Sequence, residues 1–245
     1  MKNLIGHPAL KNTIQKNLLN LTALKRGLRP APIILPLDRG EGRSSILNYA
    51  AKAYSAAGAV PLTGSREAFI ECSAEPGFTA ESLQNEVDNA GIYCRYNGVL
   101  GCDFSSMVKY LDDPEETRKV FDIMKSLSRH TFLIVFTAEQ AIGREEKMVS
   151  ALCKAFPSVV RLAPYSYTAD DLALIMASEL TKYQVEIPMQ QLRGIADNLP
   201  KKKVQYALDA LWKSVLESTL ENEKKQDTEK REKQHDSSRR TLVHP

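Results

Sequence analysis

Short apolar runs alternate along this chain with segments in which apolar residues recur every three or four positions. Near its start, leucines and isoleucines at helical spacing predict an amphipathic helix over residues 8–26, which Gly27 and Pro30 end. The apolar run at residues 33–35 then predicts a short strand, and a helix is predicted over residues 45–54. The chain therefore opens with a helix, a strand and a second helix.

Four further apolar runs have the length of short strands. They lie at residues 69–72, 98–103, 131–136 and 159–162. Helices are predicted between them, at residues 80–90, from residue 113 onward and at residues 145–156. The third of these runs is continuously apolar from residue 132, which is typical of a central parallel strand buried on both faces. This alternation predicts an α/β fold with a three-layered parallel sheet.

After about residue 166 the pattern changes to helices alone. Thr168 and Asp171 are spaced as in a capping box at the start of a helix, and two further helices are predicted after it. The end of the chain carries mixed charge with few apolar positions, so we expect it to be disordered. The predicted parts are an α/β domain over residues 1–166, a small helical lid over residues 167–220 and a charged tail over residues 221–245.

Composition narrows the classes of protein that fit this pattern. The 245 residues are 43% hydrophobic, which is enough for a core, and a net charge of +3 is too small to argue for nucleic acid as a partner. The four cysteines form no C-x-x-C pair, so no zinc site is predicted. No apolar run has the length of a membrane span, and the first residues lack the apolar core of a signal peptide. We therefore expect a cytoplasmic protein without a membrane partner.

Residues 37–44, with the sequence L-D-R-G-E-G-R-S, are similar to a phosphate-binding loop. They lie between a predicted strand and a predicted helix, which is the context that the motif G-x-x-x-x-G-K-[ST] requires. Leu37 replaces the first glycine of the motif and Arg43 replaces its lysine, whereas Gly42 and Ser44 are retained. The alternative is an ordinary glycine-containing turn of a doubly wound sheet, and the residues alone favour neither.

Three segments in order resemble the AAA+ ATPases, and most closely the subfamily of the red-type rubisco activases and the stage V sporulation protein K. Residues 4–11 resemble the family's opening motif beside the adenine. Residues 98–103 lie where the family has its Walker B strand, and residues 156–172 resemble its F-P motif with the tyrosine that follows. The resemblance covers roughly residues 3–216. It implies a P-loop NTPase-type parallel sheet followed by a helical lid.

The resemblance also implies a site for ATP or ADP with Mg²⁺. In that site Ile5 would border the adenine, and Ser44 and Asp103 would hold the metal ion. The nucleotide-binding residues that it implies are Ile5, Gly40, Glu41, Gly42, Arg43, Ser44, Ser45, Asp103, Thr137 and Lys202.

The chain departs from the family where hydrolysis needs specific groups. Arginine at position 43 is not a conservative replacement for the loop lysine, although arginine binds phosphate well. Phe104 follows Asp103, where the resemblance implies the catalytic glutamate. Lys154 is the cation nearest the position of the family's arginine finger, and a solvated lysine at a helix end is the alternative. No catalytic residue is therefore named, and hydrolysis is expected to be weak or lost.

Three hypotheses for the function remain open. The leading one is a degenerate AAA+ subunit that acts in structure or regulation, within a homo- or hetero-oligomeric ring or beside an active AAA+ partner. The second is an active AAA+ ATPase that remodels a protein client. The third is a clamp-loader-like scaffold in a DNA transaction, although nucleic acid is not the expected partner.

Overall fold

The computed structural model describes most of the chain and arranges it as two compact units, Met1–Ser166 and Tyr167–Pro245. The described residues are 4–24, 31–57, 69–73, 79–85, 99–104, 113–127, 132–156, 158–201 and 203–220. Two predictions, the lid residue Lys202 and the disordered tail at 221–245, lie outside these residues.

The first unit is built on a five-stranded sheet in the order β2-β3-β4-β1-β5, and every pair of neighbours is parallel. The strands are β1 (Ile33–Pro36), β2 (Phe69–Ser73), β3 (Val99–Asp103), β4 (Phe132–Thr137) and β5 (Val160–Arg161). Each begins or ends within two residues of the predicted apolar run. The predicted parallel sheet is confirmed, and its order brings the carboxyl ends of β1, β4 and β3 side by side.

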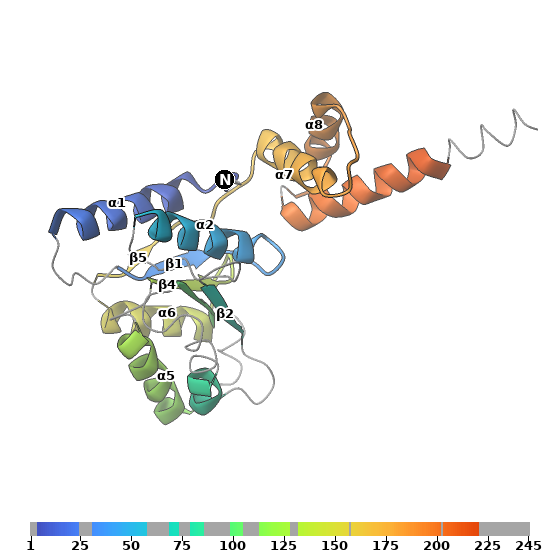
Figure 1. The fold of residues 1–245 in the computed structure, drawn as a ribbon. Coiled ribbons are helices and arrows are strands. Elements are labelled where there is room, and N and C mark those ends of the chain that lie inside the picture. The colour runs from blue at the N-terminus through green and yellow to red at the C-terminus, as the bar shows by residue number, and fades with distance from the viewer. Residues whose placement is uncertain are drawn as a thin grey trace, which may run out of the picture. The chain divides into compact units, whose positions relative to one another are not determined.

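Helices cover both faces of this sheet, as Figure 1 shows. One face carries α1 (Pro8–Leu24) and α2 (Arg43–Ala56), and the other carries α5 (Pro114–Leu127) and α6 (Arg144–Ala155). The predicted helix at residues 80–90 is described as far as residue 85. The first unit therefore has the three layers expected from the sequence.

Strand alternation sends successive side chains to the two faces. On β4, Leu133 and Val135 join a cluster with buried residues of α5 and α6, whereas Ile134 and Phe136 join a cluster with buried residues of α1 and α2. All six residues of β4 are buried, as expected for a central strand between two helical layers. The apolar clusters on both faces hold the strand ends in place.

The second unit is helical. It contains α7 (Ala169–Thr181), α8 (Met189–Asp197) and a helix over residues 204–220. The predicted capping box is confirmed: the Asp171 N–H donates to the Thr168 hydroxyl at 3.1 Å, and the Thr168 N–H donates to the Asp171 carboxylate at 3.0 Å. These two bonds satisfy donors that the first turn of a helix leaves open.

Gly101 on β3 provides a test of the packing between the sheet and α2. A Cβ atom at this position would lie 2.7 Å from Cδ1 of Leu47 and 3.1 Å from a ring carbon of Phe136. Gly101→Ala should therefore lower the free energy of unfolding by about 1–3 kcal/mol, because the added methyl group overpacks this layer. Urea unfolding followed by circular dichroism measures the change.

Gly194→Ala in α8 is the matched control, because nothing lies within 4 Å of its added Cβ atom. This variant should be neutral or gain about 0.5–1 kcal/mol from the removal of a helical glycine. Equal destabilisation by both variants would contradict the close packing at Gly101.

Candidate functional site

The loop between β1 and α2 begins as a continuation of the sheet. The Leu37 N–H donates to the Thr137 carbonyl at 2.9 Å, which extends the pairing of β1 with β4 by one residue. Gly40 and Gly42 then have φ values of 83° and 90°, in the left-handed region that glycine adopts without steric cost. The two glycines allow the loop to turn back over the strand ends and enter α2.

Helix α2 begins at Arg43, two residues earlier than predicted, so Arg43 belongs to the first turn of the helix. Its N-cap residue is Gly42, and no side-chain hydrogen bond caps this helix start. Ser44 and Ser45 follow and are both exposed. The predicted loop residues therefore form the amino end of a helix, a geometry that suits an anion.

The side chain of Arg43 is buried and folds back beneath its own loop. Its Nε and Nη2 atoms donate to the Leu37 carbonyl at 3.0 and 2.6 Å, and its Nη1 atom lies 2.7 Å from Oδ2 of Asp103. The guanidinium carbon lies 5.1 Å from the centre of the Phe136 ring. Only 4% of the side chain is exposed, so the charge that replaces the loop lysine faces the protein and not solvent.

Asp103 is the last residue of β3 and forms a second ion pair, with Arg39 of the loop between β1 and α2. The Arg39 Nε atom lies 2.8 Å from Oδ2 of Asp103, and the Asp103 side chain has no exposed surface. A carboxylate without water is tolerated only where cations and hydrogen bonds compensate it. The guanidinium groups of Arg43 and Arg39 provide that compensation. Both contact Oδ2 of Asp103, the residue that was predicted to hold magnesium.

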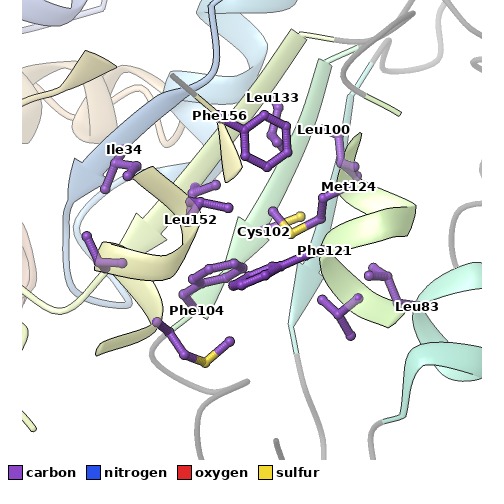
Figure 2. Close-up of a cluster of buried hydrophobic side chains, with 14 of the residues drawn as sticks. Ile34, Leu83, Leu100, Cys102, Phe104, Phe121, Met124, Leu133, Leu152 and Phe156 are labelled. Atoms are coloured by element: carbon purple, nitrogen blue, oxygen red, sulfur yellow. The ribbon is translucent and has the colours of Figure 1, made fainter. Parts of the chain in front are cut away.

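Phe104 directly follows the end of β3 and packs on the face of the sheet that α5 and α6 cover. It is fully buried in the cluster beneath α5 and α6, and its ring centre lies 6.3 Å from that of Phe121. Figure 2 shows Phe104 and Phe121 side by side among Leu100, Cys102 and Met124. The residue that stands in the place of the family's glutamate is thus a core residue, turned away from the loop that Asp103 faces.

Two carboxylates at the same edge were missed by the sequence analysis. The Asp38 carboxylate accepts the Glu139 N–H at 3.1 Å, and the Glu145 carboxylate accepts the Ala138 N–H at 2.7 Å. Burial raises the pKa of Glu145 above its usual value, and the nearby charges of Asp103 and Asp38 add to the rise. Glu145 lies in the first turn of α6, where acids are common, so its sequence context did not distinguish it.

The other predicted residues lie in several different elements. The Thr137 hydroxyl is buried and donates to the Ala138 carbonyl at 3.2 Å, and Glu41 is buried within the loop. Ile5 is half-buried before His7, whose ring centre lies 4.8 Å from that of Tyr165. Lys154 is exposed on α6. The structure therefore gathers the loop residues with Asp103 and Thr137, and Lys202 is not described.

Comparisons with known proteins bear on the fold. No family model and no curated protein matches the chain. A solved DNA replication initiation factor aligns over 91% of this chain and 64% of its own, with a TM-score of 0.54 and 16% identity. Domain III of the Thermotoga maritima replication initiation protein DnaA aligns over 90% of this chain and 89% of its own, with a TM-score of 0.53 and 13% identity.

The fold is that of the AAA+ domains. A DnaA structure with bound AMPPCP and single-stranded DNA also aligns, over 94% of this chain and 68% of its own, with a TM-score of 0.52 and 14% identity. At these identities the likeness concerns the fold alone. This chain spans less than two thirds of the replication initiation factor.

Two features are absent from the part of the chain that the structure describes. No helix among them is long and apolar enough to cross a membrane. Nor does that part of the chain hold a group of three histidine, cysteine, aspartate or glutamate side chains placed to bind a metal ion.

The contrast between the two arginines at Asp103 predicts unequal effects on stability. Arg43→Ala should lower the free energy of unfolding by about 3–5 kcal/mol, because it removes a buried partner and leaves Asp103 poorly compensated. Arg39→Ala is the matched control, since the Arg39 side chain is 61% exposed, and it should cost only ~0–1 kcal/mol. Chemical denaturation of the two variants measures the difference, and equal losses would contradict the buried pairing of Arg43.

Proposed function

We propose that this chain is an AAA+-fold subunit that does not turn over ATP and acts as a structural or regulatory member of an assembly of AAA+ subunits. The observation that carries the proposal is the buried pair of Arg43 and Asp103, 2.7 Å apart. The proposal also includes the subfamily of the red-type rubisco activases and the stage V sporulation protein K, which several segments of the chain resemble.

ATP hydrolysis in such a fold requires a cation on the outer phosphates, a hydroxyl and an acid on magnesium, and an acid that orients water. Here Arg43, which replaces the loop lysine, points toward Asp103, and the charge of Asp103 is compensated by Arg43 and Arg39. Phe104 cannot orient water, and it is packed in the core. Each of these features removes one requirement for turnover, and together they favour a subunit that does not hydrolyse.

Nucleotide binding without hydrolysis is part of the proposal. The loop keeps two glycines in the left-handed region, and α2 begins without a side-chain cap beside the exposed Ser44 and Ser45. Open N–H groups at a helix start attract phosphate. The DnaA structure that aligns with this chain holds AMPPCP, which supports a nucleotide of the ATP or ADP type as the ligand.

An assembly of AAA+ subunits is the proposed setting. A solved structure on katanin self-assembly aligns over 79% of this chain, with a TM-score of 0.50 and 14% identity. A subunit can occupy a place in a ring through its surface even where its own site is inactive. The partners are therefore proposed to be AAA+ chains, identical or different. The prediction that nucleic acid is not a partner stays untested, and salt-dependent binding of single-stranded DNA would contradict it.

One observation favours the alternative of an active ATPase. Glu145 is a carboxylate at the same edge as Asp103 and Arg43, and its raised pKa is suited to proton transfer. Its oxygen already accepts the Ala138 N–H at 2.7 Å, so it would have to exchange that bond for a water molecule. If this alternative holds, Glu145→Gln should abolish a turnover that the wild type shows.

An ATPase assay of the purified chain tests the proposal. Phosphate release should be equal in the wild type and in Asp103→Asn, because Asp103 compensates arginines and holds no reacting group. Phe104→Glu should not restore activity, since the new carboxylate would enter the apolar cluster and destabilise the core. Robust wild-type turnover that Asp103→Asn abolishes would refute an inactive subunit.

A further inference from the structure

We infer that the guanidinium group of Arg43 excludes a divalent metal ion from this site, so that the site works without one. The inference rests on the proposed function and deepens it, because the AAA+ fold implies Mg²⁺ between the loop and Asp103. The residues of this chain do not fit that ion. Arg43 and Arg39 supply the positive charge beside Asp103 that a metal would otherwise supply.

The first argument is the occupation of the Asp103 carboxylate. Magnesium requires oxygen ligands at about 2.0–2.1 Å in near-octahedral geometry. Oδ2 of Asp103 instead has the Nη1 atom of Arg43 at 2.7 Å and the Nε atom of Arg39 at 2.8 Å. A cation that approached this oxygen would meet two positive charges, and at least one arginine would have to leave.

The second argument is that the Arg43 side chain cannot leave Asp103 without losing its other buried contacts. Its guanidinium also donates twice to the Leu37 carbonyl and lies over the ring of Phe136. Displacement would break these contacts and leave a buried charge without its carboxylate, which is strongly unfavourable. Arg39 is mostly exposed and could turn into solvent, so the exclusion depends on Arg43.

The third argument concerns the neighbouring carboxylates. Asp38 and Glu145 each accept a backbone N–H, from Glu139 and Ala138. Among the residues that the structure describes, no three acidic, histidine or cysteine side chains converge as metal ligands. The edge therefore offers a divalent cation no substitute for Asp103. A nucleotide bound here would be held by the loop and the start of α2 without its metal.

Binding of Mn²⁺, a paramagnetic substitute for Mg²⁺, tests the inference directly on the full chain. The free ion is measured by its electron paramagnetic resonance signal in titrations of four proteins: wild type, Asp103→Asn, Arg43→Ala and the double variant. The wild type and Asp103→Asn should bind Mn²⁺ equally. Arg43→Ala should bind more than the double variant, because removal of the guanidinium opens Asp103 to the ion.

Arg43→Lys is the second variant, in case Arg43→Ala does not fold. Its single ammonium group cannot donate to the Leu37 carbonyl and form an ion pair with Asp103 as the forked guanidinium does, so it too should gain binding that Asp103→Asn removes. Circular dichroism confirms that each protein compared is folded.

Two results would overturn the inference. One is wild-type Mn²⁺ binding that Asp103→Asn removes, and the other is a folded Arg43 variant that gains no Asp103-dependent binding. The proposed function fails on a different measurement. ATP turnover would refute the inactive subunit but would not contradict metal exclusion. Asp103-dependent Mn²⁺ binding in a protein without turnover would refute metal exclusion but would not contradict the inactive subunit.

Discussion

The ion pair of Arg43 and Asp103 joins two parts of the sheet that are not neighbours. Arg43 begins α2 after β1, Asp103 ends β3, and β4 lies between these strands. The guanidinium spans that gap over Phe136 of β4 and also bonds the Leu37 carbonyl of its own loop. One buried side chain therefore fixes the loop, the helix start and the strand end at once. Removing it would leave Asp103, which has no exposed surface, with Arg39 as its cation.

The apolar core and the charged groups of the site lie in different parts of the sheet. The apolar clusters on the two faces of the sheet are built from side chains of the strands and helices, and Phe104 lies in one of them. Charges at the carboxyl edge are compensated within the chain, through arginines for Asp103 and backbone N–H groups for Asp38 and Glu145. In the proposed function, such a domain takes part in assembly through its surface, and the two arginines replace a metal ion in the charge balance of Asp103.

Sequence patterns predicted the sheet and most helices because apolar periodicity reports burial directly. The run from Phe132 to Phe136 was clear for that reason, and the capping box was recognised from the spacing of Thr168 and Asp171. The loop was harder, since the identity of Arg43 does not reveal the direction of its side chain. Arg39 and Asp103 are separated by 64 residues, so their contact depends on the tertiary fold. Phe104 was recognised as the loss of an acid, whereas its role in the core became evident only from the packing around it.

The most direct test of the central claim is a crystal structure of the chain grown with AMPPCP and an excess of Mg²⁺. The account predicts that Nη1 of Arg43 stays within hydrogen-bond distance of Oδ2 of Asp103, with no metal ion on that carboxylate. A magnesium ion coordinated by Ser44 and tied to Asp103, with Arg43 turned out of the loop, would contradict it.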